Sequence, residues 1–432
     1  MNWKIRPAHT LRGRVEVPGD KSISHRALLH AALATGTSRI TNFLQAGVTD
    51  AMLRCVRGLG VAVELEAAGA LLVHGGQLRS PAALLDCGNS GATIRMLMGA
   101  LAGQRDLIAT LTGSAGLRRR PMRRVAAPLR LMGADIANDT PPVTIHGQPL
   151  RGVDYTLPVA SAQIKAAILL AALQADGPTT LHEPGPSRDH SERLLRAIGV
   201  EVVSRGNTVI LTPPERRLRA FELTVPGDIS SAAFLCAAAA LVPHADVTLL
   251  AVGVNDTRTG LLDALLQMGA ALSLENQREI NGEPIAEVTV KTSDLRGIAI
   301  AGDRVVRMID EFPIFAALAT QATGETRVRE AEELRVKESD RIAMLALELR
   351  KLGAHIEERP DGFVIDGPTR LRGAVVDSHG DHRLALALAV AGLIAEGETI
   401  IANAEAYRES FPNFVALMRE LGADMEADTD KD

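Results

Sequence analysis

A pattern that recurs six times along the chain most constrains how this sequence can fold. Each copy joins turn-forming or capping residues to an Ala/Leu-rich stretch, and most of these stretches end near a glycine. The copies begin at Gly19-Asp20-Lys21-Ser22, Gly88-Asn89-Ser90-Gly91, Ala160-Ser161-Ala162-Gln163, Gly227-Asp228-Ile229-Ser230, Ile309-Asp310-Glu311-Phe312 and Gly380-Asp381-His382-Arg383. They are spaced by about 70 residues, with one longer interval before Asp310, and such internal repeats indicate a fold assembled from similar units.

A second landmark ends another helix-type stretch in each repeat. There a Leu, Met or Ile is followed by glycine, and alternating strand-type residues come next. The pairs are Leu59-Gly60, Met132-Gly133, Ile198-Gly199, Met268-Gly269, Leu352-Gly353 and Leu421-Gly422. Glycine just past a helix supplies the left-handed residue that terminates it. The combined pattern predicts six units of the βαβαββ kind, in which each helix is covered by sheet.

A third landmark, a Leu-Arg pair after the strands, indicates how the chain closes. Five copies follow the helix pairs, and the sixth stands near the N-terminus as Leu11-Arg12-Gly13. We therefore expect the first strands, from Lys4 to Val17, to complete the sixth unit. A linear solenoid is the alternative, but it needs polar caps at both ends that the sequence lacks.

The predicted fold class is α/β, with two lobes that each contain three βαβαββ repeats. One lobe is expected to be continuous over residues 20–228, and the other to join 1–19 to 229–432. Only two crossings, near Asp20 and Asp228, would then link the lobes. The acidic tail Glu426–Asp432 is expected to be frayed.

The length, net charge, cysteine content and apolar runs of the chain limit the class of protein. At 432 residues the chain is too long for one ordinary core, and its net charge of −5 argues against a general nucleic-acid binder. Three cysteines without a C-x-x-C pair suit reduced thiols in a cytosol. The longest apolar runs are too short for a membrane span, and the N-terminal residues lack the apolar stretch of a signal peptide. We expect a cytoplasmic protein that binds neither nucleic acid nor membrane.

Cations gather at the first helix start and in the loop after the first helix of the second repeat. Lys21, Ser22 and Arg26 lie where unpaired backbone N–H groups and the helix dipole favour a phosphate or carboxylate; a solvated basic helix start is the alternative. The stretch 118–124 contains five arginines in seven residues. A solvated charge run is the usual interpretation, whereas Pro121 and the acidity of the whole chain favour an anion site.

Ser161, Gln163 and Lys165 open the third repeat, and Ser187-Arg188-Asp189-His190 follows its strand. This mixture of neutral donors and few cations suits a hydroxyl acid that carries a phosphate. By contrast, Asp228 begins the fourth repeat without a cation, and we expect it to serve as a helix cap.

The fifth and sixth repeats combine acids with bases. Glu333–Arg341 contains three acids and three bases in nine residues, which suit a surface helix start with i,i+4 pairs. Together with Asp310, however, the same stretch also supplies an acid, a base and anion-binding cations. Asp381-His382-Arg383 adds a cation and an imidazole. His379, Asp381 and His382 do not indicate a metal site, because the rest of a ligand set is absent.

These motifs, in this order, resemble those of the 5-enolpyruvylshikimate-3-phosphate synthases, also called 3-phosphoshikimate 1-carboxyvinyltransferases. The motifs are Pro18-Gly19-Asp20-Lys21-Ser22-Ile23-Ser24-His25-Arg26, Gly88-Asn89-Ser90-Gly91, Arg120-Pro121-Met122, Ser161-Ala162-Gln163, Arg335-Val336-Lys337-Glu338-Ser339-Asp340-Arg341 and Asp381-His382-Arg383. They span nearly the whole chain. The family's fold has two lobes of three βαβαββ units, the number reached above from the repeats.

The resemblance implies transfer of the enolpyruvyl group of phosphoenolpyruvate to the 5-hydroxyl of shikimate 3-phosphate, with release of phosphate and without a metal or organic cofactor. It implies that Asp310 and Glu338 are the acid and base, with Lys21 also catalytic. The residues implied to bind shikimate 3-phosphate are Lys21, Ser22, Arg26, Ser161, Ala162, Gln163, Ser187, Asp310 and Lys337. Those implied to bind phosphoenolpyruvate are Lys21, Gly91, Arg120, Gln163, Arg341 and Arg383.

Two positions depart from the family pattern. Ala92 stands where some members have Thr, and Arg408 lies near the place of a Lys that assists phosphoenolpyruvate in some members. The sister transferase that acts on a UDP-amino sugar is one alternative, but it has Lys-Asn instead of Lys21-Ser22 and a reactive Cys in a loop that here, over Ser114–Met122, has none. A non-catalytic anion-binding module is the other alternative. We expect a monomer whose lobes close around the substrates.

Overall fold

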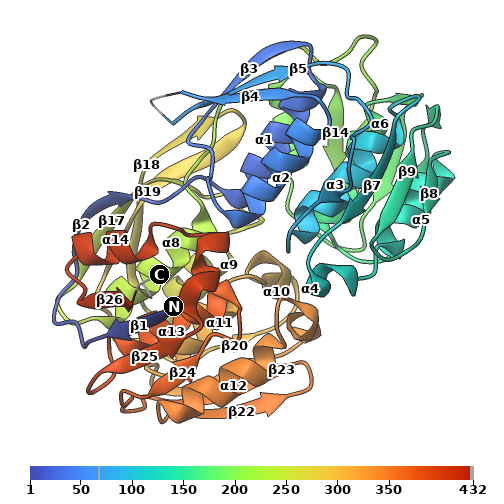
Figure 1. Ribbon diagram of the computed structural model, residues 1–432. Helices are drawn as coiled ribbons and strands as arrows, with labels where there is room; N and C mark the ends of the chain where they lie inside the picture. The colour runs from blue at the N-terminus through green and yellow to red at the C-terminus, as the bar shows by residue number, and fades with distance from the viewer. Residues whose placement is uncertain (67–68, 429–432) are drawn as a thin grey trace. The chain divides into compact units, whose positions relative to one another are not determined.

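The computed structural model describes residues 1–66 and 69–428 (Figure 1). The chain divides into two compact units. Unit 1 comprises Met1–Pro18, Gly227–Arg278 and Pro284–Asp432, and unit 2 comprises Gly19–Pro226 and Glu279–Glu283. Two of the boundaries, at Pro18/Gly19 and Pro226/Gly227, fall within the two Val-Pro-Gly-Asp sequences of the chain.

Unit 2 contains three four-stranded sheets, ordered β16-β3-β5-β4, β6-β7-β9-β8 and β11-β13-β15-β14. In each sheet the first pair of strands is parallel and the other pairs are antiparallel. The strands are β3 (Gly36–Thr41), β4 (Ala62–Leu65), β5 (Leu71–Gly75), β6 (Leu85–Asp86), β7 (Ile108–Thr112), β8 (Asp135–Ala137), β9 (Val143–His146), β11 (Asp154–Thr156), β13 (Thr179–His182), β14 (Val202–Arg205), β15 (Thr208–Leu211) and β16 (Glu222–Thr224). A two-stranded parallel sheet is formed by β10 (Leu150–Arg151) and β12 (Ala175–Asp176).

The helices of unit 2 follow the same threefold plan. The first helices of the repeats are α1 (Lys21–Leu33), α3 (Gly91–Ala102) and α6 (Ala162–Ala172). The second helices are α2 (Gly47–Gly58), α5 (Arg123–Leu131) and α7 (His190–Ala197), and a short extra helix, α4, spans Ala115–Arg118.

Unit 1 contains three sheets of the same size, ordered β18-β19-β17-β2, β20-β21-β23-β22 and β24-β25-β1-β26. The strands are β1 (Asn2–Ile5), β2 (Arg12–Glu16), β17 (Asp246–Gly253), β18 (Ala271–Ile280), β19 (Glu283–Lys291), β20 (Ala299–Ile300), β21 (Gly324–Val328), β22 (His355–Arg359), β23 (Gly362–Gly367), β24 (Val375–Asp377), β25 (Thr399–Ala402) and β26 (Met425–Asp428). The helices are α8 (Ile229–Leu241), α9 (Gly260–Met268), α10 (Asp303–Arg307), α11 (Phe312–Ala319), α12 (Arg341–Lys351), α13 (His382–Gly392) and α14 (Phe414–Glu420), with 3₁₀ helices at Glu332–Val336 and Ala404–Glu409.

The predicted repeat is confirmed at the level of its elements. A helix begins at or just after each of the six predicted starts, and three four-stranded sheets accompany the three repeats of each unit. The six glycines predicted to terminate the second helices all adopt positive φ; they are Gly60, Gly133, Gly199, Gly269, Gly353 and Gly422. The α/β fold class with three βαβαββ repeats per unit therefore stands.

The predicted role of the first strands needs one correction. Strand β1 pairs with β25 and β26 in the sixth sheet, as expected, but β2 pairs in parallel with β17 and belongs to the fourth sheet. The strand that precedes the fourth repeat in the chain, β16, pairs with β3 in unit 2, and β2 supplies the corresponding strand of the fourth sheet. The prediction of a frayed tail is wrong for Glu426–Asp428, which lie in β26; the last four residues lie outside the described part of the chain.

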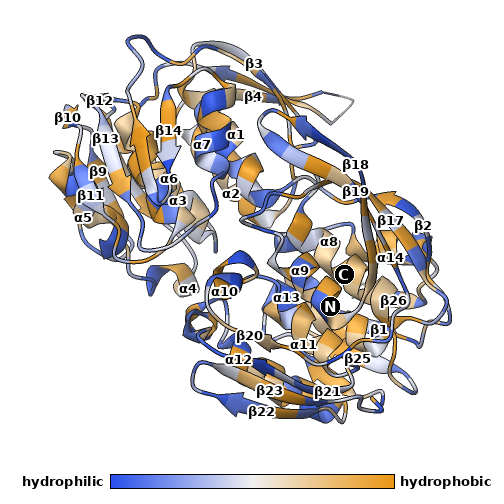
Figure 2. Ribbon diagram, turned by 180° about the vertical axis from the view of Figure 1, so that it is seen from behind, coloured by the Kyte–Doolittle hydropathy of each residue, from blue (hydrophilic) through white to orange (hydrophobic). Residues whose placement is uncertain are grey.

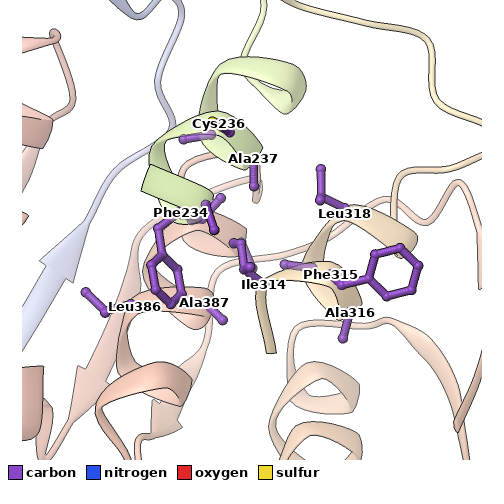
Figure 3. Close-up of a cluster of buried hydrophobic side chains, with 14 of the residues drawn as sticks. Phe234, Cys236, Ala237, Ile314, Phe315, Ala316, Leu318, Leu386 and Ala387 are labelled. Atoms are coloured by element: carbon purple, nitrogen blue, oxygen red, sulfur yellow. The ribbon is translucent and has the colours of Figure 1, made fainter. Parts of the chain in front are cut away.

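The first helices of the repeats form the centre of each hydrophobic core. In unit 1, the cluster in Figure 3 joins Phe234 of α8, Phe315 of α11 and Leu386 of α13, all nearly inaccessible to solvent. Helix α8 is drawn mainly in apolar colours in Figure 2 because almost every residue of its sequence is apolar or small. A helix that is apolar on all sides is stable only when it is buried. Within the described residues, no helix is both long and apolar enough to cross a membrane.

In unit 2 the close packing of α3 on α6 depends on a missing side chain. A Cβ placed on Gly99 would lie 2.0 Å from the carbonyl oxygen of Ala167, a backbone atom that cannot move aside alone. Gly76, in the same unit, has nothing within 4 Å of its would-be Cβ. The two positions make a matched pair for testing the packing.

We predict that Gly99→Ala destabilises the protein by about 1–3 kcal/mol or more, because the added methyl group forces α3 and α6 apart. Gly76→Ala should change stability by less than about 0.5 kcal/mol. The urea midpoints of the two variants and the parent protein measure the difference. Equal midpoints for both variants would contradict the close approach of these helices.

Candidate active site

The first turn of α1 presents the lysine and serine predicted to bind substrate. The Asp20 carboxylate caps the helix by accepting a hydrogen bond from the Ile23 N–H at 2.9 Å. Lys21 and Ser22 therefore occupy the first helical positions and remain partly exposed. Backbone N–H groups at this end, with the positive pole of the helix dipole, favour an anion beside these side chains.

Arg26, one turn further along α1, is buried and holds the surrounding segments together. Its Nε donates to Ser191 Oγ at 2.8 Å, and its Nη1 and Nη2 donate to the carbonyl oxygens of Ser22 (2.9 Å) and Ala162 (3.3 Å). Burial lowers the pKa of Arg26 to about 10. These bonds use three of the five N–H groups of its guanidinium to fix two residues that were themselves predicted to bind substrate.

A second group of predicted residues meets at the start of α3. Ser90 caps this helix by accepting from the Thr93 N–H at 3.1 Å. A Cβ on Gly91 would lie 3.3 Å from Arg120 Nη1 and 3.1 Å from Arg95 Nη1, so both guanidinium groups lie against this glycine. Arg95 donates in turn to the amide oxygen of Gln163. Gly91, Arg120 and Gln163, all predicted to bind phosphoenolpyruvate, are therefore neighbours in unit 2.

Sequence reasoning missed Arg95. It lies four residues after Gly91 on α3 and hence on the same helix face, which is the signal that would have identified it. Of the five arginines in the stretch 118–124, only Arg120 is half-buried, and the other four are exposed. The solvated interpretation therefore holds for four of them, and Arg120 alone lies against Gly91.

The start of α6 and the loop before α7 hold the remaining predicted residues of unit 2. Ser161 precedes α6, but its hydroxyl makes no capping bond. Lys165 was expected to be a cation available to ligand; instead it is buried and forms ion pairs of 2.7 Å with both Glu183 and Glu192. Ser187 donates its hydroxyl to Glu183.

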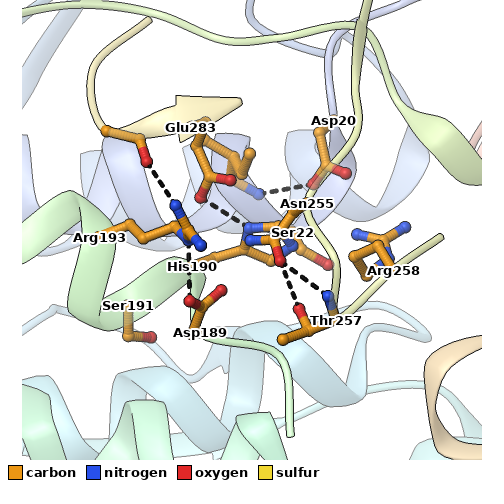
Figure 4. A network of polar contacts seen from close by, with 12 residues as sticks. Asp20, Ser22, Asp189, His190, Ser191, Arg193, Asn255, Thr257, Arg258 and Glu283 are labelled. Carbon is orange, nitrogen blue, oxygen red and sulfur yellow. Dashed lines mark hydrogen bonds and ion pairs between the residues drawn. The ribbon is translucent and has the colours of Figure 1, made fainter. Parts of the chain in front are cut away.

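A hairpin tip completes the surroundings of α7. Glu283, which belongs to unit 2, accepts a hydrogen bond from His190 Nδ1 at 2.7 Å, and both side chains are buried. Arg193 binds Asp189 at 2.8 Å and the Gly282 carbonyl oxygen at 2.9 Å (Figure 4). No sequence pattern pointed to Glu283, because its partner lies 93 residues away.

In unit 1 the predicted residues surround one buried guanidinium. Arg341, at the start of α12, has a side chain that is 1% exposed. It binds Asp381 through Nε at 2.8 Å and Glu338 through Nη2 at 2.8 Å, and its Nη1 lies 3.7 Å from Asp310. Although burial opposes its charge, the carboxylates of Asp381, Glu338 and Asp310 raise the pKa of Arg341 above its ordinary value.

The neighbours of this cluster extend it. Arg383 Nη2 lies 3.6 Å from the second oxygen of Asp310, so this carboxylate lies between two arginines. Asp381 also caps α13 by accepting from the Arg383 N–H at 2.9 Å. Burial would raise the pKa of Asp381, but Arg341 beside it lowers that pKa below its ordinary value. Lys337, predicted to bind shikimate 3-phosphate, pairs with Glu333 at 3.4 Å.

At the start of the fourth repeat, Asp228 serves as a helix cap, as expected. Asp228 caps α8 by accepting from the Ser230 N–H at 2.8 Å, and Arg258 lies 3.4 Å from the same carboxylate.

Two further residues singled out in the sequence have partners within the protein. His379 binds Glu348 at 2.8 Å, and Arg408 lies 5.9 Å from the ring centre of Tyr407. Among the described residues, no group of three or more His, Cys, Asp or Glu side chains is arranged to hold a metal ion.

Comparison with known proteins gives consistent matches. The sequence model of the family described as EPSP synthase (3-phosphoshikimate 1-carboxyvinyltransferase) matches residues 5–418. A 3-phosphoshikimate 1-carboxyvinyltransferase of Gloeobacter violaceus is 51% identical over 419 residues, covering 95% of this chain and 97% of that protein. Another, of Thermodesulfovibrio yellowstonii, is 47% identical over 429 residues, covering 98% and 100%.

Two solved structures match the fold of this chain. EPSP synthase from Acinetobacter baumannii matches with a TM-score of 0.88 at 43% identity, covering 98% of this chain and 99% of that one. The enolpyruvyl transferase NikO from Streptomyces tendae matches with a TM-score of 0.82 at 22% identity, covering 98% of each chain, and shows a shared fold alone.

The buried histidines of α1 generate a pH prediction. Burial lowers the pKa values of His25 and His30 from 6.5 to about 4. The unfolded chain therefore binds more protons than the folded one between these values, and stability falls as the pH is lowered from 6.5 towards 4. Each histidine contributes a loss of up to about 1.4 kcal/mol per pH unit within this window.

The imidazole resonances of His25 and His30 measure this directly, with His25→Gln and His30→Gln used for their assignment. Both rings should stay mostly neutral as the pH is lowered to about 5. A midpoint near 6.5 for either ring would contradict its burial in the folded protein.

Proposed function

The chain belongs to the EPSP synthase family, the 3-phosphoshikimate 1-carboxyvinyltransferases, and we propose that it transfers the enolpyruvyl group of phosphoenolpyruvate to the 5-hydroxyl of shikimate 3-phosphate, releasing phosphate. The two substrates carry several negative charges between them, and both units present cations at helix starts. Their chemistry needs anion-binding groups together with an acid and a base.

One observation supports this function above the others: Asp310 and Glu338 both contact the single guanidinium of Arg341. The two proposed acid/base groups thus have fixed positions on one buried cation. Arg341 Nη1 is a buried atom without a hydrogen-bond partner, 3.7 Å from Asp310, and we assign its N–H groups to the carboxylate of phosphoenolpyruvate. An anion-binding module without catalysis has no need of two carboxylates at the same cation.

We assign the substrate contacts as follows. In unit 2, Lys21, Ser22, Arg26, Ser161, Ala162, Gln163 and Ser187 contact shikimate 3-phosphate, with Arg26 acting chiefly through the backbone groups that it fixes. Lys21, Gly91, Arg120 and Gln163 contact phosphoenolpyruvate. In unit 1, Asp310 and Lys337 contact shikimate 3-phosphate, and Arg341 and Arg383 contact phosphoenolpyruvate.

The reaction has two halves, and each moves one proton in and one out. In the first, the 5-hydroxyl oxygen bonds to C2 of phosphoenolpyruvate, the hydroxyl loses its proton, and the methylene carbon gains one. In the second, the resulting methyl group loses a proton, the bond from C2 to the phosphate oxygen breaks as that oxygen takes up a proton, and phosphate leaves. We assign Asp310 to proton transfer at the 5-hydroxyl and Glu338 to proton transfer at the methylene carbon. A sequence of addition and elimination needs two such carboxylates in different surroundings.

The assay that tests this function measures phosphate released from shikimate 3-phosphate and phosphoenolpyruvate in the presence of a metal chelator. Phosphate should appear in step with the enolpyruvyl product and only when both substrates are present. Release from phosphoenolpyruvate alone, or no release at all from a folded protein, would overturn the assignment.

The first prediction from this assignment concerns Lys21. Lys21→Ala should keep the fold but nearly abolish turnover, because the lysine contacts both substrate anions and losing such a contact costs about 2–5 kcal/mol. Lys291→Ala, which removes an exposed lysine of unit 1, is the matched control and should turn over like the parent. Turnover of Lys21→Ala within threefold of the parent would remove Lys21 from the site.

The second prediction separates the two carboxylates. In D₂O, Glu338→Gln should slow deuterium entry into the methylene group of phosphoenolpyruvate more than Asp310→Asn does. Each group is expected to contribute about 10²–10⁴-fold to the steps it serves. Mass spectrometry of recovered phosphoenolpyruvate measures the exchange. The reverse order would exchange the two roles, and unchanged exchange in both variants would exclude the pair.

A further inference from the structure

The hydroxyl of Ser187 is already committed within the protein. It donates its hydrogen bond to one carboxylate oxygen of Glu183, and the serine is 7% exposed. The other oxygen of Glu183 accepts from Lys165 Nζ at 2.7 Å. Because Lys165 also binds Glu192 at 2.7 Å, Glu183 is held from the side opposite Ser187 by a lysine that is itself fixed.

This group is buried, and the buried guanidinium of Arg26 lies close enough to Glu192 for their charges to interact. The side chains of Lys165, Glu183 and Glu192 are 1%, 5% and 2% exposed. Burial raises the pKa of Glu192, and its Oε2 is a buried atom without a hydrogen-bond partner. Removing one partner of a buried ion pair is strongly destabilising, so Lys165 and its two carboxylates have fixed positions.

The direction of the hydrogen bond between Ser187 and Glu183 determines what the serine can offer to a ligand. A serine hydroxyl has one proton and two lone pairs, so a serine that donates to Glu183 can only accept from a ligand. A phosphate monoester with a second pKa near 6 has no proton to donate at pH 8 and needs donors from the protein. As placed, Ser187 therefore presents the wrong polarity to a substrate phosphate.

We propose that Glu183 is a positioning residue that competes with the substrate phosphate for the proton of Ser187, and that Lys165 holds it in that role. This inference rests on the proposed function, in which Ser187 contacts shikimate 3-phosphate. Binding of the phosphate turns the hydroxyl away from Glu183, and the loss of that bond weakens affinity for the phosphate. Lys165 keeps Glu183 in place when the hydroxyl leaves.

The substitution Glu183→Gln reverses this polarity. Lys165 has only donors, so it takes the amide oxygen of the glutamine and directs the amide NH₂ towards Ser187. Ser187 then accepts a hydrogen bond, and its proton becomes available to the phosphate. Glu183→Gln should therefore tighten binding, whereas a residue with a purely structural role would weaken binding or leave it unchanged when replaced.

The experiment measures the dissociation constant of shikimate 3-phosphate by calorimetry at pH 8. Glu183→Gln should lower it by about three- to tenfold, the range expected for one hydrogen bond. Glu192→Gln is the matched control, because it removes the same charge from the same lysine without touching Ser187; its effect should be clearly smaller. Shikimate, which lacks the phosphate, should bind both variants and the parent alike.

A double-mutant cycle isolates the hydroxyl. In a Ser187→Ala background, Glu183→Gln should no longer tighten binding, because no proton remains to be released. If Glu183→Gln does not fold, Glu183→Asp replaces it: the shorter carboxylate keeps Lys165 but withdraws from Ser187, and it should also tighten binding.

Three results would overturn the proposal. They are unchanged or weaker binding by the folded variants, equal gains in Glu183→Gln and Glu192→Gln, and a gain that persists without the Ser187 hydroxyl. A parent protein that binds no shikimate 3-phosphate would overturn the proposed function as well, whereas a parent that binds it normally confines any failure to the role of Glu183.

Discussion

The first helix of each repeat is buried on almost every side, and this constraint determines where the chemistry of the protein can lie. Helices such as α8 and α13 are nearly inaccessible along their whole length. Polar side chains in the body of such a helix would cost free energy without a partner, so those that occur there, such as Arg26 of α1 and Lys165 of α6, are paired within the protein. The N-terminal ends also present unpaired N–H groups and positive partial charge, which suit anionic substrates.

Charged side chains near the starts of α1 and of α12, the second helix of the fifth repeat, have partners that suit their charge. Arg26 is fixed by a hydroxyl and two carbonyl oxygens, and burial lowers its pKa. Arg341 is fixed by three carboxylates that raise its pKa despite burial. In the first case the cation organises backbone groups; in the second it organises the two carboxylates proposed as acid and base. Cations that are fixed in advance lose less conformational freedom when they bind anions.

Much of this arrangement is readable in the sequence because repeats and helix caps are local signals. The six helix starts and the glycines that end the second helices follow from residue types at regular spacing. The parts that could not be predicted depend on contacts between distant residues. Strand β2 pairs in the fourth sheet, and Glu283 meets His190, but neither pairing has a local pattern. Lys165 resembled a free cation because its partners Glu183 and Glu192 lie 18 and 27 positions further along the chain.

The central claim is that the first turns of the buried helices form the substrate site, and a crystal structure with bound shikimate 3-phosphate tests it most directly. We predict phosphate density at the starts of α1 and α6, within hydrogen-bond distance of Lys21, Ser22 and Ser161. Phosphate bound elsewhere, for instance at the exposed arginines Arg123 and Arg124, with both helix starts unoccupied, would contradict the account.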